Sequence, residues 1–210
     1  MNSLLVLGAG GHGKVVAETA EAIGGWESVA FLDNDVSKLN AAFRWPVVGI
    51  QKDVASLRTE YAAAIVAIGH AVTRLRLLDE LEAIGFELPV LRHPSAWVSP
   101  SASLGNGSVV FAGAVIQADS HLGRGVIVNT SASIDHDCQL ADGVHVCPGV
   151  HLAGNVTVGE ASWLGIGCVV KQGVRIGSGV TVGAGGVVLK DVADDLTVVG
   201  CPARAIEACE

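Results

Sequence analysis

Three histidines, His136, His145 and His151, lie close together in the second half of the sequence, and His136 stands between two acids, Asp135 and Asp137. An imidazole has an ordinary pKa near 6.5, so it accepts a proton at neutral pH. A neighbouring carboxylate selects the tautomer of the ring and raises its basicity. This segment therefore predicts general-base chemistry, in which His136 takes a proton from an attacking nucleophile.

A second segment that could take part in chemistry is the glycine-rich run Gly8–Gly13, which also contains His12. It matches G-x-G-x-x-G between an apolar run and a helical pattern, and Asp33 follows about twenty residues later. In that context the helix N-terminus binds phosphate and the acid binds a ribose hydroxyl. Fewer than about a hundred residues precede residue 94, where a different sequence pattern begins. This length fits one mononucleotide-binding half rather than a full dinucleotide-binding fold.

The elements that position this loop follow from the apolar pattern of the N-terminal region. Apolar runs predict strands and amphipathic runs predict helices, and their alternation is typical of a small parallel α/β sheet. In the helix expected over 72–84, the side chains of Leu75, Leu78 and Leu81 should face the sheet. The expected strands are 3–7, 29–32, 63–68 and 88–91, and the expected helices are 14–23 and 72–84.

From residue 94 the sequence follows a period of six. Starting at Val98, every sixth residue through Val188 is Val, Leu or Ile, and the residue two places earlier is usually small, as at Ala96 and Ala102. Six is an even number, so a strand keeps the same face inward from one hexad to the next. Three short strands with three corners then form an 18-residue coil, which predicts a solenoid whose coils contact only their neighbours.

The hexad register also predicts where the candidate residues point. His136 lies two places after Ile134, at a corner, whereas His145 and His151 each precede an inward residue and face outward. Gly154 follows His136 by one coil and is expected at the same corner. Its N–H is a candidate donor to an oxyanion.

Domain bounds follow from these periods. We expect an α/β domain over 1–93, the solenoid over 94–190 and an irregular cap over 191–210 that includes Gly200–Arg204.

Composition excludes several classes of protein. The 210 residues carry 13 Lys and Arg against 21 Asp and Glu, a net charge of −8. This charge disfavours binding to nucleic acid or to an anionic membrane surface. No apolar run reaches the roughly 18 residues of a membrane span, and no signal-peptide pattern is present. Five cysteines without a CxxC pair fit reduced thiols, so we expect a cytoplasmic protein.

The glycine-rich start, the hexapeptide repeat, the segment Asn129–Asp137 and the terminal Gly-Cys-Pro-Ala-Arg together resemble the left-handed β-helix acyltransferases. Within these, the chain resembles the group of sialic-acid O-acetyltransferases and bacillosamine N-acetyltransferases. The resemblance implies a Rossmann-like subdomain followed by a left-handed parallel β-helix, a cyclic trimer, and acetyl-CoA as co-substrate. It assigns the base to His136 and the tuning acid to Asp137, although the acid of the family is often Glu.

The same resemblance implies two sets of binding residues. Those expected to contact acetyl-CoA are His145, Ile166 and Ala184. Those expected to bind a nucleotide-linked sugar are Gly10, Gly11 and His12 near the phosphates, Asp33 and Asn34 near the base or ribose, and Gly69 in a neighbouring loop. No metal site is expected.

Five functions remain open on the sequence. We favour N-acetylation of the 4-amino group of a nucleotide-linked 4-amino-4,6-dideoxy sugar, with UDP as the nucleotide. O-acetylation of a sialic-acid-like sugar needs the same base and is the alternative. A zinc hydratase would need three converging histidines, which the hexad register does not provide. An NAD oxidoreductase leaves the repeat unexplained, and a scaffold without activity leaves the His–Asp pair unexplained.

Overall fold

The computed structural model describes residues 3–35, 37 and 44–206, so Cys209 and the last four residues of the expected cap lie outside the described residues. The chain divides into two compact units, Met1–His93 and Pro94–Glu210. No helix in the described part of the chain is long and apolar enough to cross a membrane.

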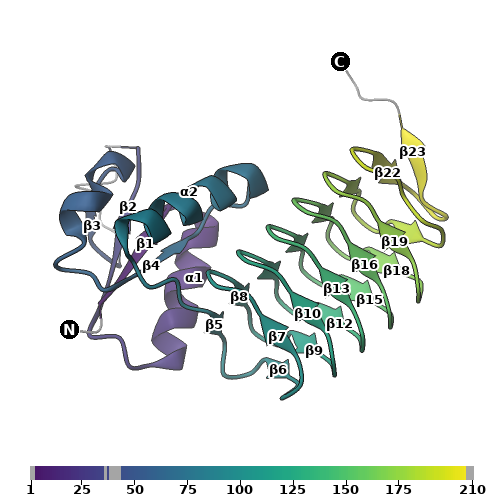
Figure 1. Ribbon diagram of the computed structural model, residues 1–210, viewed down its shortest axis with the longest axis horizontal. Coiled ribbons are helices and arrows are strands. Elements are labelled where there is room, and N and C mark those ends of the chain that lie inside the picture. Colours follow the sequence, from purple (N-terminus) through teal and green to yellow (C-terminus); the bar gives the residue numbers. More distant parts are fainter. Residues whose placement is uncertain (1–2, 36, 38–43, 207–210) are drawn as a thin grey trace. The chain divides into compact units, whose positions relative to one another are not determined.

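The first unit contains a parallel sheet of four strands in the order β3-β2-β1-β4 (Figure 1). The strands are β1 (Ser3–Leu7), β2 (Ser28–Leu32), β3 (Val47–Gly49) and β4 (Ala63–Val66). The helices are α1 (Gly11–Ile23), the 3-10 helix η2 (Gln51–Leu57) and α2 (Ala71–Ile84), and a two-residue strand, β5 (Leu91–Arg92), ends the unit.

Both faces of the central strand β1 and of β4 are covered, which is why these two strands are buried along their whole length. Side chains alternate along a strand, so Leu5 and Leu7 share one face and pack with Leu78 of α2. Phe31 lies on the opposite face, toward the start of α1, because a Cβ added to Gly13 would lie 3.1 Å from its ring.

Glycines make the turn between β1 and α1 possible. Gly8 has φ +108°, a conformation that side chains rarely adopt, and a Cβ on Gly13 would overlap the carbonyl oxygen of Gly8. By contrast, a Cβ on Gly10 or Gly11 would meet nothing within 4 Å. Gly8 and Gly13 are therefore required by the fold, whereas Gly10 and Gly11 leave open space at the helix start.

Three expectations for this unit need correction. Helix α1 begins at Gly11 rather than at residue 14, because Gly10 serves as its N-cap. The region 88–91 adds no strand to the sheet, which receives only a bridge between Glu87 and Ala63. Strand β3 and helix η2 were not expected from the apolar pattern. In α2, Leu75 packs against the core as expected, although it is only partly buried, and Arg74 is also fully buried.

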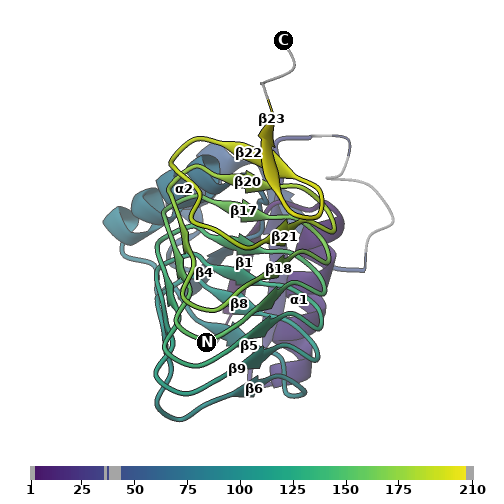
Figure 2. The ribbon, with the colours of Figure 1, turned by 90° about the vertical axis from the view of Figure 1, so that its right-hand side faces the viewer.

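The second unit is a parallel β-helix of triangular coils, seen from one end in Figure 2. Its first face holds β6 (Trp97–Val98), β9 (Val115–Ile116), β12 (Ser133–Ile134), β15 (His151–Leu152), β18 (Val169–Val170) and β21 (Val187–Val188). Its second face holds β7 (Ser103–Leu104), β10 (His121–Leu122), β13 (Gln139–Leu140), β16 (Thr157–Val158) and β19 (Arg175–Ile176). Its third face holds β8 (Val109–Val110), β11 (Ile127–Val128), β14 (His145–Val146), β17 (Trp163–Leu164), β20 (Thr181–Val182) and β22 (Thr197–Val199).

The period of six is confirmed strand by strand. Each strand from β6 to β21 ends on one of the sixth-place residues between Val98 and Val188, and paired strands stand 18 residues apart, as His121 beside Gln139 illustrates. From Val110 to Val188 all of these residues are buried, as are small residues such as Ala114. The apolar column inside the prism thus stabilises every coil through its neighbours.

The tail beyond residue 190 is more regular than expected. Strand β22 continues the third face in parallel with β20, and β23 (Arg204–Ile206) returns antiparallel to β22. Val198 is buried and extends the apolar column by one more layer. The end of the solenoid is therefore closed by a short hairpin, which leaves little open strand edge.

Candidate active site

His136 lies in the turn after β12, where the first face meets the second, and this position is called the His136 corner below. Its Nδ1 lies 2.7 Å from Oδ2 of Asp137. A carboxylate only accepts hydrogen bonds, so Nδ1 carries the proton and donates it to Asp137. Nε2 of the neutral ring then holds the free lone pair. The His136 side chain is 61 % exposed, so this lone pair is accessible.

The turn itself places Asp137 beside the imidazole. Asp137 has φ +59°, in the left-handed region that Asp and Asn tolerate better than most residues. The same conformation recurs one coil earlier at Asp119 and one coil later at Asn155. Hydrogen bonds also fix the turn, since the N–H of Asp137 donates to the carbonyl oxygen of Ala118 at 3.0 Å.

The surrounding charges favour the protonated form of the base. The hydrogen bond to Asp137 is the main cause that raises the pKa of His136 above its ordinary value, and the negative charges of Asp135 and Asp137 add to it. Partial desolvation opposes this shift. The result is a stronger base than an isolated imidazole, as the sequence led us to expect.

Gly154 lies against the His136 ring, one coil further along. A Cβ at this position would lie 2.6 Å from both Cε1 and Nε2 of His136. Gly154 does not have a left-handed backbone, so the need for glycine here is a need for space. The stacking is held by the N–H of Asn155, which donates to the carbonyl oxygen of His136 at 2.8 Å.

The three residues expected to contact acetyl-CoA lie elsewhere on the β-helix. Ile166 and Ala184 follow β17 and β20, at the corner between the third and first faces, which we call the Ile166 corner. They stack on successive coils, because the N–H of Gly185 donates to the carbonyl oxygen of Ile166. Ile166 is 57 % exposed. The first face separates this corner from the His136 corner within one chain.

His145 lies in β14 on the third face. Its side chain is partly buried, although the sequence register predicted that it would face outward. Its ring lies 6.3 Å from that of Trp163 in an edge-on arrangement, and its Nε2 is 3.4 Å from Nδ2 of Asn129. His151 is exposed on the first face, and its Nδ1 pairs with the hydroxyl of Ser133 at 2.7 Å. The three histidines therefore occupy separate sites, and no cluster of three metal-binding side chains is found within the described residues.

In the first unit, the residues expected to bind the nucleotide meet at the carboxyl ends of the strands. Gly10 and Gly11 start α1 after β1, Asp33 follows β2, and Gly69 follows β4. This is the edge at which parallel α/β sheets bind ligands. Asp33 links two of these loops, because its Oδ2 accepts from the N–H of Ala9 at 2.7 Å.

Two other residues in this region have defined surroundings. Asn34 pairs with Gln51 through its amide nitrogen at 3.0 Å and through its amide oxygen at 3.1 Å. The Nε2 atom of His12 is buried, and burial, followed by the charge of Arg74, lowers the pKa of His12 to about 4. His12 is therefore a neutral group at physiological pH and offers no positive charge to a phosphate.

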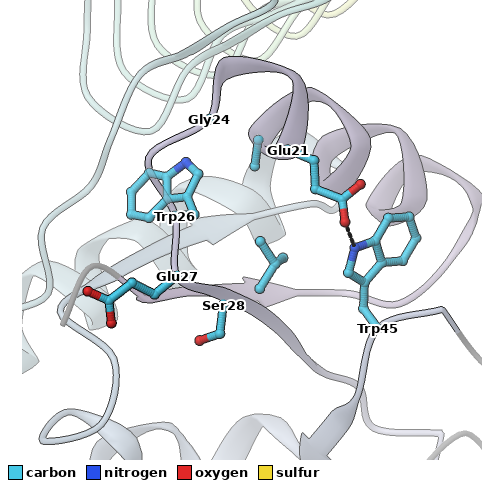
Figure 3. Close-up of a pocket in the computed structure, with 8 residues that line it drawn as sticks. Glu21, Gly24, Trp26, Glu27, Ser28 and Trp45 are labelled. Carbon is cyan, nitrogen blue, oxygen red and sulfur yellow. Dashed lines mark hydrogen bonds between the residues drawn. The ribbon is translucent and has the colours of Figure 1, made fainter.

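A different hollow, of about 210 Å³, lies at the amino end of β2, between Trp26 and Trp45 (Figure 3). Nε1 of Trp45 donates to Glu21 at 2.7 Å on one side of it. Ser28, at the start of β2, also lines this hollow, which places it at the opposite end of the strands from Asp33 and Gly69. None of the expected site residues lines it.

Sequence reasoning missed Arg74, whose side chain is buried beneath the loop that contains Gly69. A signal was present, because Arg74 precedes Leu78 by four positions and Leu81 by seven, on the inward side of the helix. An apolar pattern alone treats such a residue as exposed.

Comparison with known proteins supplies the family. Residues 3–81 match the family model described as the PglD N-terminal domain. The acetyltransferase domain of PglB from Neisseria gonorrhoeae, solved in complex with acetyl coenzyme A, is 48 % identical, with a TM-score of 0.94 over 98 % of this chain and 100 % of that one. The chain belongs to the PglD family of hexapeptide-repeat acetyltransferases.

Two further PglD-family relatives carry substrate names. PerB from Caulobacter crescentus, solved with CoA and GDP-perosamine, is 42 % identical, with a TM-score of 0.93 over 99 % of this chain and 98 % of that one. UDP-N-acetylbacillosamine N-acetyltransferase from Bacillus subtilis is 36 % identical over 53 % of this chain, and the chain spans only 52 % of its length. The predicted family and the predicted fold class, a Rossmann-like unit followed by a left-handed β-helix, are confirmed.

Proposed function

We propose that the chain is an acetyl-CoA-dependent N-acetyltransferase that modifies the 4-amino group of a UDP-linked 4-amino-4,6-dideoxy sugar. The observation that carries the proposal is the His136–Asp137 pair lying against Gly154, in a chain that matches PerB and the PglB acetyltransferase domain over nearly its whole length. The names of the relatives contain both UDP and GDP sugars. The choice of UDP is therefore the part of the proposal that needs a direct test.

The chemistry is a direct transfer without an acyl-enzyme. The amine nitrogen attacks the carbonyl carbon of the thioester, so a C–N bond forms and the C–S bond breaks. Nε2 of His136 takes the proton that the nitrogen loses, and the imidazolium then gives it to the departing thiolate of CoA. Asp137 keeps the proton of the ring on Nδ1 throughout and stabilises the imidazolium.

Gly154 is proposed as the donor to the oxyanion. Its N–H makes no hydrogen bond to another residue in the described part of the chain, whereas its carbonyl oxygen accepts from the N–H of Gly173. A backbone N–H beside the base is suited to stabilise the negative charge that develops on the carbonyl oxygen. Because Gly154 carries no side chain, substrate and imidazole can both approach it closely.

The nucleotide-sugar is proposed to bind at the strand ends of the first unit. The open space beside Gly10 and Gly11 lets a diphosphate approach the start of α1. Asp33 and Asn34 are proposed to lie near the ribose or base, with Gly69 on the neighbouring loop. His12 takes part as a neutral residue.

A cyclic trimer is proposed from the arrangement of the two corners. His136 and the proposed CoA residues Ile166 and Ala184 occupy corners separated by the first face, so one chain alone does not bring them together. In a cyclic trimer, the His136 corner of one copy can face the Ile166 corner of the next. We therefore propose that each active site is shared between two copies.

The function is tested by measuring thiol release from acetyl-CoA with 4-amino-4,6-dideoxy sugars linked to UDP, GDP or dTDP, and with a free sialic acid. We expect release with a UDP-linked amino sugar. Release only with a GDP- or dTDP-linked sugar would correct the nucleotide, and release only with sialic acid would replace N-acetylation by O-acetylation. No thiol release with any of these acceptors would contradict the proposed acetyl transfer.

The shared site is tested by mixing two inactive variants, His136→Ala and Ala184→Trp, and allowing the copies to exchange. Trimers that contain both variants hold some sites with an intact His136 and an intact Ala184, so we expect activity to return. Activity that stays absent after exchange, or a fully active monomer in light scattering, contradicts the shared site.

A further inference from the structure

Arg74 lies in the first turn of α2 and its side chain is fully buried. Among the residues that the structure describes, it is the only charged side chain in the buried class. A buried guanidinium is costly unless its charge and its donors are used. Arg74 has no direct part in the proposed reaction. Its contacts therefore have to show why a charged side chain is buried here.

The guanidinium binds the loop between β4 and α2 from the interior of the unit. Its Nη1 donates to the carbonyl oxygen of Ile68 and to that of Gly69, each at 2.8 Å. Hydrogen bonds from a charged donor are stronger than neutral ones. Two successive carbonyl groups of the loop are therefore held toward Arg74.

This arrangement sets the direction of the next two N–H groups. In a trans peptide the C=O and N–H bonds point in opposite directions, and both peptides here are trans. The N–H groups of Gly69 and His70 consequently point away from Arg74, and both residues are exposed. Neither N–H has a hydrogen-bond partner among the described residues. Successive outward N–H groups of this kind bind anions.

The charge of Arg74 also reaches the loop after β1. It adds to burial in lowering the pKa of His12 to about 4, so His12 remains neutral beside it. Burial lowers the pKa of Arg74 itself to about 10, which leaves it positive at physiological pH. A fixed positive charge thus lies beneath the β4–α2 loop and acts on His12 in the loop after β1, while the N–H groups of Gly69 and His70 point away from it.

We propose that Arg74 is a positioning residue for the diphosphate of the nucleotide-sugar, which it serves from beneath the β4–α2 loop without touching it. It directs the N–H groups of Gly69 and His70 toward the ligand and adds a positive charge behind them. The inference rests on the proposed nucleotide-sugar function, and it goes further by naming the residue that shapes the phosphate site.

The test compares Arg74→Gln and Arg74→Lys with the matched control Arg76→Gln in the full chain. Arg76 lies on the same helix but is exposed and forms a surface ion pair with Glu80. Binding of UDP and GDP and binding of CoA are measured separately by calorimetry, and folding is checked by thermal unfolding. We expect Arg74→Gln to weaken nucleotide binding about tenfold, Arg74→Lys to weaken it less, and CoA binding to stay unchanged in both.

A purely structural role would lower the unfolding temperature and weaken UDP, GDP and CoA alike. Nucleotide binding equal to that of Arg76→Gln in either folded Arg74 variant would overturn the inference. If Arg74→Gln does not fold, Arg74→Lys carries the same comparison. Absence of UDP and GDP binding in the wild-type chain would instead overturn the proposed function, and the inference with it, so the two failures are distinguishable.

Discussion

His136 and His12 are the same side chain in two electrostatic environments. His136 is exposed at a corner of the β-helix, where the hydrogen bond to Asp137 raises its pKa. His12 lies against the interior of the α/β unit, where burial and then Arg74 lower its pKa to about 4. One imidazole is prepared to take up a proton, and the other to stay neutral beside a cation.

This difference shows how each unit supplies charge to its ligand. At the His136 corner the proposed active group is an ionisable side chain, and its neighbours tune its basicity. At the strand ends of the α/β unit the groups proposed to bind a ligand are backbone N–H donors, and the cation stays buried behind them. A base must gain and lose protons during turnover, whereas an anion site needs a charge that does not change.

Removing the imidazole tests the catalytic half of this comparison with the largest expected effect. His136→Ala should lower kcat by about 10²- to 10⁴-fold, because no other group accepts the proton of the amine. The control is His121→Ala, since His121 is also exposed and hydrogen-bonded, to Ser103 at 2.7 Å. Steady-state kinetics measure both, and a rate for His136→Ala within twofold of the wild type would remove His136 from the mechanism.

Removing the charge of Asp137 tests whether that carboxylate tunes the base. Asp137→Asn keeps a side chain that tolerates φ +59°, but should lower kcat by about 10²-fold because the ring loses its oriented tautomer. The pKa of wild-type His136 is raised, so kcat/KM should increase with pH through an inflection above 6.5. In the variant this inflection should move to lower pH.

Asp119→Asn is the matched control for that profile, because Asp119 occupies the same left-handed turn one coil earlier, with φ +57°. It should leave both the rate and the inflection unchanged. An inflection that stays in place in Asp137→Asn would show that the carboxylate does not tune His136.

Filling the space at Gly154 should displace the base without removing it. In Gly154→Ala, the new Cβ would lie 2.6 Å from Nε2, so the ring must shift, and we expect kcat to fall about tenfold. Gly85→Asn serves as the control, because Gly85 ends α2 in a left-handed conformation and a Cβ there would lie 3.9 Å from Nε of Arg58, an ordinary contact distance. Equal rates in the two variants would contradict the contact between Gly154 and the base.

The smallest expected effect concerns stability and tests the neutral histidine. The pKa of His12 is about 4 in the fold and near 6.5 in an unfolded chain, so the unfolded state takes up the proton first as pH falls. This contribution is complete above pH 6.5 and is lost between pH 6.5 and 4, by about 3 kcal/mol at most. Urea unfolding at both ends of this range should show a smaller loss in His12→Leu, and an equal loss would show that His12 titrates normally.

The β-helix could be predicted closely because one physical requirement repeats along it. Every coil must fill the same column, so each inward position, from Val110 to Val188, is aliphatic, and the register then places His136 and Gly154 at one corner. The sequence indicated that Asp137 tunes His136, but it did not predict the geometry of their contact. It depends on a left-handed turn that the apolar pattern does not report.

The α/β unit was less predictable because its contacts do not repeat. Strand β3 has three residues, of which Val48 is exposed, so its apolar signal is short and interrupted. Arg74 was missed because its burial depends on two carbonyl oxygens of a loop, and no hydropathy pattern records them. The spacing of Arg74 from Leu78 and Leu81 indicated an inward position, but its contacts with the loop explain why a charged residue occupies it.

Because each coil takes 18 residues to pass around three faces, the number of residues between two positions determines the faces on which they lie. Adding or deleting one hexad turns everything beyond it by one face, and only a change of three hexads restores the alignment. His136 and Gly154 are in contact across one such interval, so the segment between them tolerates no change in length. Evolution can lengthen this protein freely only by whole coils, and only outside that segment.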